Sequence, residues 1–96
     1  STQVEEARSA DIEEMEEALV SVVMDRDGQC WVQGKPCSAS EIEYRVSSLI
    51  EDRSDRRVML KIDKNQLQRD FGGVLMALSE AGAEIVLLGR KEGVQK

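Results

Sequence analysis

The sequence predicts an α+β domain with the element order ββαβαβ, in which two helices pack on one face of a mixed four-stranded sheet. Residues 57–89 carry the main observation: an apolar segment, an amphipathic segment and a second apolar segment follow one another at the length of a βαβ unit. Such crossovers are almost always right-handed. Residues 19–33 carry the second observation, because a β-branched run turns at Gly28 and continues as another strand.

The chain has 96 residues, the length of one domain, and its net charge of −6 is concentrated at one end. Residues 1–18 hold seven acids and one base, whereas the remainder holds 12 of each. A ligand with a phosphate backbone requires a basic face, which a neutral body beside an acidic arm does not provide. The charge distribution therefore argues against nucleic acid as a partner.

The sequence contains no histidine and only two cysteines. Ser-His and Cys-His nucleophilic pairs are excluded, as are imidazole ligands for zinc, and two cysteines are too few for a structural zinc site. Asp63 and Lys64 follow a predicted strand, where their residue types fit a turn. We therefore predict that the fragment is not an enzyme and has no catalytic, cofactor-binding or metal site.

The acidic segment at the N-terminus has two interpretations. Ile12, Met15 and Leu19 recur at helical spacing, which would form one apolar helix face. Closely spaced glutamates repel one another and favour an extended linker instead. The chain has neither an initiator Met nor a signal peptide, so we expect a piece of a longer protein, and no apolar run is long enough to span a membrane. The predicted organisation is a linker arm at 1–18, a domain at 19–89 and a polar tail at 90–96.

A hairpin is predicted for residues 19–33, with Gly28 at a turn position that requires a positive φ. Its alternation directs one set of side chains toward the core and leaves Val23 and Trp31 on the outer face. Gln33-Gly34 forms a second, two-residue turn, in which Val32 faces Lys35 and Cys30 faces Cys37. The inward set is Val20, Val22, Met24, Cys30 and Val32.

The first helix is predicted over residues 41–53. Ser38 and Glu41 have the spacing of a capping box. Glu41 and Arg45 add an i,i+4 pair of opposite charges. The apolar stripe consists of Ile42, Val46, Leu49 and Ile50.

The second helix follows the strand at Val58 to Ile62 and ends at Gly82, which suits a left-handed C-cap. Gly72 and Gly73 lie inside it at a cost of roughly 1 kcal/mol each relative to Ala. They indicate either close packing on the sheet or a later start of the helix. The predicted apolar face consists of Leu67, Phe71, Val74, Leu75, Leu78 and Ala81.

Two helices can cover only one face of the sheet, so the other face is predicted to bind a partner. The last strand, residues 84–88, is apolar on both faces, and we assign Ile85 and Leu87 to the uncovered side. An exposed apolar patch usually marks an interaction surface. We expect a homodimer or a partner strand at this face or its edge, whereas Trp31 has the alternative of covering its own strand. The predicted interface consists of Val23, Trp31, Met59, Ile85 and Leu87.

Three segments carry a resemblance to a known family. The run VVMDRDGQCWVQGKPCSASEIEYRV contains an acidic-x-Asp-Gly turn, an aromatic strand, a Gln-Gly turn, Lys-Pro and a Ser-capped helix. LKIDKN and VLMALSEAGAEIVLLG supply the next strand and turn, then a helix, an Ala-Gly stop and a final strand. In this order they resemble the ExbD/TolR biopolymer-transport family over about residues 19–89. The segment Gln66 to Phe71 departs from it, because it lacks the family's Pro and is a few residues longer.

The resemblance implies the periplasmic domain of a single-pass inner-membrane protein driven by the proton-motive force. It implies an ExbB/TolQ/MotA-like membrane partner, bound through a transmembrane helix that this chain lacks, and a TonB- or TolA-like protein or peptidoglycan as the recipient of the force. The proton-carrying Asp of the family lies in that helix, so no residue here inherits its role. The alternative is that the chain is a small cytosolic α+β domain with a nucleic-acid-binding or regulatory function. A third hypothesis is a small enzyme.

Cys30 and Cys37 have two interpretations. If they face each other, as the Gln33-Gly34 turn predicts, their Cβ atoms are near enough for a disulfide, which an oxidising periplasm would permit. The other interpretation is a pair of small buried hydrophobic residues.

Overall fold

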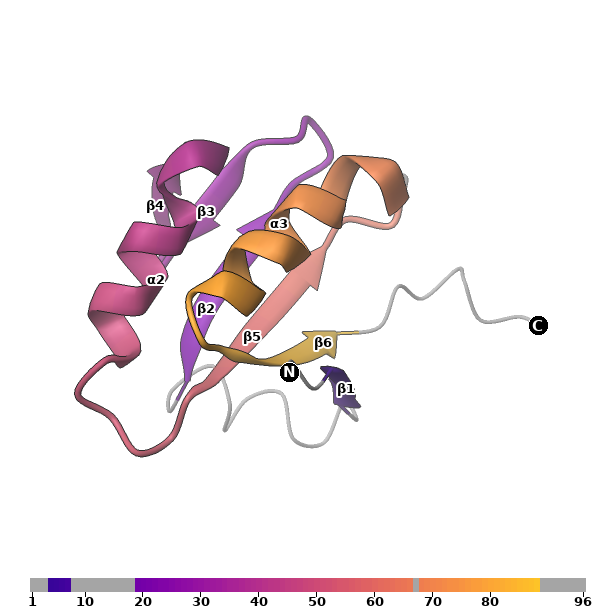
Figure 1. Cartoon of the computed structure of the whole chain (residues 1–96). Coiled ribbons are helices and arrows are strands. Elements are labelled where there is room, and N and C mark those ends of the chain that lie inside the picture. The colour runs from indigo at the N-terminus through magenta and orange to yellow at the C-terminus, as the bar shows by residue number, and fades with distance from the viewer. Residues whose placement is uncertain (1–3, 8–18, 67, 89–96) are drawn as a thin grey trace.

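The computed structural model of the chain describes residues 4–7, 19–66 and 68–88, and the side chains of residues 19–66 and 71–88. Within these ranges, six strands form one mixed sheet in the order β1-β6-β5-β2-β3-β4 (Figure 1). The pairs β1–β6, β6–β5 and β5–β2 are parallel, whereas β2–β3 and β3–β4 are antiparallel. The elements are β1 (Val4–Ala7), β2 (Val20–Met24), β3 (Cys30–Val32), β4 (Lys35–Cys37), the 3-10 turn η1 (Ala39–Glu41), α2 (Ile42–Ile50), β5 (Arg57–Ile62), α3 (Gln68–Glu80) and β6 (Glu84–Leu88).

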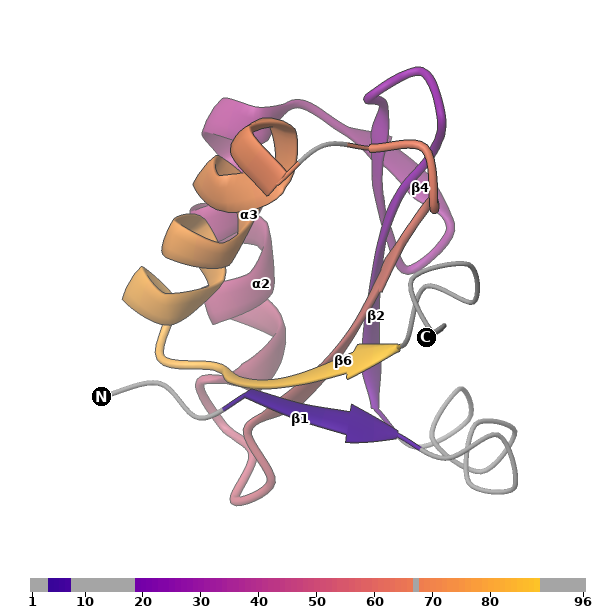
Figure 2. The same cartoon turned by 90° about the vertical axis from the view of Figure 1, so that its right-hand side faces the viewer.

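Both α2 and α3 lie on the same face of the sheet, as predicted (Figure 2). The α+β class and the mixed sheet are confirmed, but the expected number of four strands is too small. β4 is the second strand of the hairpin that turns at Gln33-Gly34, and β1 pairs with β6 in parallel. Neither interpretation of residues 1–18 included a strand at Val4–Ala7. Ile12, Met15 and the tail at 90–96 lie outside the described residues, so the arm and tail boundaries stay predictions.

The two predicted hairpin turns have the expected backbone geometry. Gln33 has a φ of 53° and Gly34 a φ of 80°, the pair of positive values that a two-residue type I′ turn requires. This turn sets the predicted register, in which Val32 lies opposite Lys35 and Cys30 opposite Cys37. Gly28 has a φ of 84°, again as predicted. Short-range turn chemistry therefore fixes the pairing of β2, β3 and β4.

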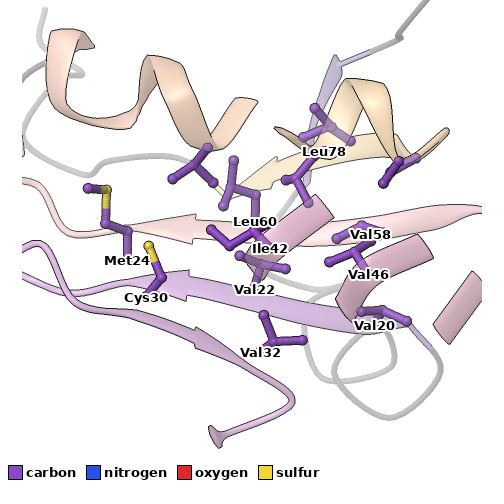
Figure 3. Packing of buried hydrophobic residues seen from close by; sticks show 14 of the residues in the cluster. Val20, Val22, Met24, Cys30, Val32, Ile42, Val46, Val58, Leu60 and Leu78 are labelled. Carbon is purple, nitrogen blue, oxygen red and sulfur yellow. The ribbon is translucent and has the colours of Figure 1, made fainter. Parts of the chain in front are cut away.

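The hydrophobic core lies between the sheet and the two helices (Figure 3). Alternate residues of β2, β3 and β5 enter it, because successive side chains of a strand point to opposite faces. Ile42, Val46 and Ile50 of α2 are fully buried, but Leu49, predicted on the same stripe, is 39% exposed. The strand and α3 residues labelled in this cluster are Val20, Val22, Met24, Cys30, Val32, Val58, Leu60 and Leu78.

The start of the first helix differs from the predicted capping box. Ser38 makes no side-chain cap, and its carbonyl oxygen instead accepts the Glu41 N–H at 3.0 Å. This bond closes η1, so the α-helix begins at Ile42. The Ser38 hydroxyl bonds to the hydroxyl of Ser40 at 3.2 Å. A 3-10 turn thus satisfies the amide that the predicted box would have served.

The second helix begins before its glycine pair and ends as predicted. Gly72 and Gly73 lie within α3, and a Cβ added to either would meet nothing within 4 Å. Neither close packing on the sheet nor a later helix start explains them. Gly82 has a φ of 86°, which fits the left-handed C-cap. Of the predicted apolar face, Phe71, Val74, Leu78 and Ala81 are buried and Leu75 is partly buried, whereas the side chain of Leu67 lies outside the described part.

The register between β5 and β6 reverses the predicted orientation of the last strand. Val58 lies opposite Ile85, and Leu60 opposite Leu87. Residues directly opposite each other on neighbouring strands point to the same face, so Ile85 and Leu87 face the helices together with the core residues of β5. The assignment of Ile85 and Leu87 to the uncovered face was therefore wrong. Since β6 is apolar on both faces, its sequence alone could not distinguish the two orientations.

Candidate partner-binding surface

The predicted interface residues do not gather on one face. Val23, Trp31 and Met59 lie on the side of the sheet away from the helices, as expected. Ile85 is 1% exposed in the core, and Leu87 packs against that core as a partly buried residue. Met59 is only 2% exposed, so its side chain has almost no surface to offer a partner. Of the predicted set, only Val23 and Trp31 are both partly exposed and on the helix-free face.

Trp31 is bound to a turn of its own chain. Its indole N–H donates to Oδ2 of Asp25 at 3.0 Å. Oδ1 of the same carboxylate accepts the N–H groups of Asp27 and Gln29, each at 2.9 Å. The Trp31 hydrogen bond lowers the pKa of Asp25 below its usual value, and the two backbone bonds lower it further, although desolvation opposes them. These contacts agree with the alternative in which Trp31 covers its own hairpin.

Gln66 connects this turn to the loop before α3. Its side chain is 7% exposed, and its Nε2 donates to the carbonyl oxygens of Asp25 at 3.1 Å and Arg26 at 2.8 Å. A second connection runs from the Asp63 N–H to the Met24 carbonyl at 2.9 Å. The sequence departs from the resembled family at the segment Gln66 to Phe71. The first residue of this segment, Gln66, thus binds the turn between β2 and β3.

The large exposed apolar side chains of the described residues lie on the helices and not on the helix-free face. They are Tyr44 at 74%, Leu49 at 39% and Met76 at 65% exposed. Tyr44 and Leu49 lie on α2 and line an open groove of about 360 Å³ between that helix and the β3–β4 hairpin. We call this the α2 groove; its lining is Tyr44, Arg45, Ser48 and Leu49 from α2, and Val32, Gln33 and Lys35 from the hairpin. Sequence reasoning missed it because Leu49 fits the apolar stripe and Tyr44 was assigned no role.

The α2 groove carries positive charge. Lys35 and Arg45 line it, and no acidic residue does. In the described part of the chain, the predicted Glu41–Arg45 ion pair does not form, and neither base of the groove has a carboxylate within salt-bridge distance. Nη1 of Arg45 instead donates to the carbonyl oxygen of Pro36 at 3.2 Å. The groove therefore presents two cations beside exposed apolar surface.

The edge of the sheet next to the groove is closed to strand addition. β4 is the last strand of the described sheet, and its central residue is Pro36. Proline has no N–H to donate, and the carbonyl oxygen of Pro36 already accepts from Arg45. Proline and charged side chains commonly protect exposed sheet edges in this way. A partner at this place would have to bind through side chains.

Cys30 and Cys37 lie directly opposite each other, as predicted, and both are buried free thiols. Burial is the main cause that raises the pKa of each. Val32 and Lys35 flank the two-residue turn and form a hydrogen-bonded pair. Cys30 and Cys37 lie two residues further from the turn, so they also occupy a hydrogen-bonded position. Hydrogen-bonded pairs are the more widely spaced kind in antiparallel sheets. The facing arrangement is confirmed, and the two interpretations of the pair, a disulfide or two small buried hydrophobic residues, both stay open.

Two further carboxylates, Asp55 and Asp63, have structural partners. Asp55 forms an ion pair with Arg57 at 2.9 Å, and hydrogen bonds from Arg57 are the main cause that lowers the pKa of Asp55 to about 2. Oδ1 of Asp63 accepts the Asn65 N–H at 2.9 Å, which fits the predicted turn. Within the described ranges, no cluster of three or more acidic, Cys or His side chains could hold a metal ion.

A comparison of the sequence with protein-family models identifies the family of the chain. The model of the family described as biopolymer transport protein ExbD/TolR matches residues 1–92. The chain belongs to the ExbD/TolR family. A search of curated proteins finds no match. The match confirms the resemblance and extends it from residues 19–89 into the acidic arm.

Proteins of the ExbD/TolR family are membrane-associated and serve biopolymer transport. Among the helices that the structure describes, none has the length and apolar character of a membrane span.

Proposed function

We propose that this chain is the periplasmic domain of a single-pass inner-membrane subunit that transmits energy from the proton-motive force. The observation that carries the proposal is the ExbD/TolR match over residues 1–92. In this proposal the domain acts through protein contacts and performs no catalysis, in keeping with a sequence that has no histidine for a nucleophile–base pair. The same match favours a transport subunit over a cytosolic domain that binds nucleic acid.

The proposed partners follow from the division of labour that the family resemblance implies. An ExbB/TolQ/MotA-like membrane protein would be bound through a transmembrane helix beyond this chain, where the proton-carrying Asp would also lie. The domain would pass the force to a TonB- or TolA-like protein or hold peptidoglycan. For that task it needs a rigid body and an accessible contact surface. The parallel strands β2, β5 and β6, packed under two helices, supply the rigid body. The exposed side chains of α2 supply the contact surface.

The proposal includes a homodimer. β1 is the other edge of the described sheet, and β6 is its only strand neighbour there. An edge strand exposes unpaired backbone N–H and C=O groups that another chain can pair with. Unlike β4, β1 contains no proline. We therefore place the dimer contact at this edge, with Val23 and Trp31 of the helix-free face as candidates for further contact.

Labelling of a substituted cysteine tests the location. Ser54 is exposed in the loop between α2 and β5, and the native Cys30 and Cys37 are buried, so Ser54→Cys in the full-length protein gives a distinct signal. We expect a membrane-impermeant maleimide to label it in cells with a permeabilised outer membrane and an intact inner membrane. The unsubstituted protein is the control for background. Labelling of Ser54→Cys only after the inner membrane is lysed would contradict the proposal.

The coding sequence upstream of Ser1 gives an independent check. The proposal expects a span of about 20 apolar residues that contains one Asp. A start codon directly before Ser1, with no such span, would contradict the membrane-anchored subunit.

A further inference from the structure

We propose that the α2 groove binds an extended segment of a partner protein that places a carboxylate near Lys35 and Arg45 and an apolar side chain against Tyr44 and Leu49. The inference rests on the proposed function, which makes protein contact the task of this domain, and it adds where the contact is and what chemistry the partner carries. Four observations support it: exposed apolar area, two cations without a carboxylate partner among the described residues, a strand edge that lacks a central backbone donor, and the mismatch of a second copy with the same surface.

The apolar part of the groove has no partner within the described chain. The other outward positions of α2 are polar, as the exposed Glu43 and Ser48 illustrate. Tyr44 and Leu49 break this pattern, at 74% and 39% exposed. Tyr and Arg are among the residue types that contribute most to the binding energy of protein interfaces, and Tyr44 and Arg45 both line this groove. An apolar side chain of the partner that covers Tyr44 and Leu49 would remove this surface from water.

The charge of the groove selects an acidic partner. Lys35 and Arg45 line it without an acidic neighbour in the lining, in a protein whose net charge is −6. Arg45 is held in place by its bond to the Pro36 carbonyl, and one bond leaves most of the guanidinium's N–H donors for a ligand. A carboxylate between a lysine and an oriented guanidinium is a charge-assisted contact, which also rejects basic segments.

The closed edge defines how the segment binds. Pro36 offers no N–H, and Arg45 already donates to its carbonyl oxygen, so an added strand on β4 would find no backbone donor at the centre of that edge. Recognition therefore depends on side chains that enter the groove. Affinity then comes from the apolar contact and specificity from the carboxylate.

The same surface of a second copy does not fit the groove. A two-fold symmetric dimer that joined the two grooves would bring Lys35 and Arg45 of one protomer toward those of the other. Like charges that face each other in an interface are unfavourable. The dimer edge proposed above lies at β1, at the opposite end of the sheet from β4, so both contacts can form at once.

Selection from a random peptide library tests the inference. The 96-residue chain is immobilised, and 12-residue peptides displayed on phage are selected against it. We expect the enriched peptides to share an Asp or Glu within a few positions of an aromatic or aliphatic residue. One of them is then synthesised, together with a matched peptide in which the acid is replaced by its amide. Dissociation constants are measured for the wild-type chain and four variants.

Two variants alter the groove, and two matched variants alter equivalent residues elsewhere. Lys35→Gln removes a groove cation, and Tyr44→Ser removes its most exposed apolar side chain. Lys61→Gln, on the helix-free face, and Met76→Ser, on α3, are the controls. We expect Kd to rise about threefold to fivefold for Lys35→Gln and at least tenfold for Tyr44→Ser, and to stay within twofold for both controls. The amide peptide should bind more weakly and should no longer distinguish Lys35→Gln from the wild type.

Several outcomes would overturn the inference. These are enriched peptides without acids, no enrichment at all, equal loss in the control variants, or equal binding of the acid and amide peptides. Soluble muropeptides that shift the NMR signals of Tyr44 and Leu49, when no selected peptide does, would assign the groove to the cell wall instead. Dimerisation abolished by Tyr44→Ser in sedimentation would assign it to a second copy. Each failure would leave the labelling result for Ser54→Cys unaffected, so the location of the domain is tested separately.

Discussion

Ile85→Ala tests whether Ile85 is buried in the core, where the pairing of β6 with β5 places it. Ile85 is 1% exposed, faces the helices and belongs to the core cluster. Truncation of a buried Ile to Ala removes about 2–5 kcal/mol of stability, because apolar burial is lost and a cavity remains. For a domain of this size, 1 kcal/mol corresponds to a shift of about 4–8 °C in Tm. A loss of about 3 kcal/mol therefore predicts a Tm lower by about 12–24 °C.

Urea unfolding measures this loss. Trp31 is the only tryptophan, and its bond to Asp25 makes its fluorescence a probe of the folded hairpin. Circular dichroism follows the helices independently, and coincident transitions support a two-state analysis. Glu84→Ala is the control, since Glu84 is exposed on the same strand. A loss below about 1 kcal/mol for Ile85→Ala would contradict the burial of Ile85, because it is the result expected for an exposed side chain.

Three further predictions concern the helix, the acid limb and the thiols. Gly73→Ala should raise the free energy of unfolding by up to about 1 kcal/mol, because the site is helical and open, and a lower urea midpoint would contradict this. The pKa of Asp55 is lowered to about 2 by Arg57, so its stabilising contribution should be complete above pH about 4 and decline as the pH falls toward 2. Asp55→Asn should reduce the difference in stability between pH 5 and pH 2.5, and an unchanged difference would count against the ion pair. Thiol titration of unreduced, denatured protein distinguishes the two interpretations of Cys30 and Cys37: no reactive thiol is expected for a disulfide, whereas two reactive thiols would rule the disulfide out.

Local turn chemistry made much of the fold predictable from the sequence. Gly28, Gly34 and Gly82 each stand where a positive φ is needed, and with them the hairpins, the end of α3 and the facing cysteines follow. These features depend on residues close together in the sequence. The placement of both helices on one face followed from the amphipathic patterns.

Features that depend on the pairing of distant strands could not be predicted from the sequence alone. β6 is apolar on both faces, so only its pairing with β5 shows that Ile85 belongs to the core. β1 has no distinct strand pattern and is defined by its pairing with β6. Leu49 has the correct spacing for the core, yet it lies at the edge of α2 nearest the hairpin and lines the groove. The candidate site was therefore found from exposure in the folded chain rather than from periodicity.

Photo-cross-linking in living cells tests most directly whether the domain transmits energy through contacts at the α2 groove. A benzophenone amino acid replaces Tyr44 in the full-length protein, and the same replacement at Met76, also exposed, is the control. The account predicts a cross-link to an envelope protein from position 44 but not from position 76, with a yield that changes when a protonophore collapses the proton gradient. A cross-link pattern that is the same at both positions, or a yield indifferent to the protonophore, would contradict it.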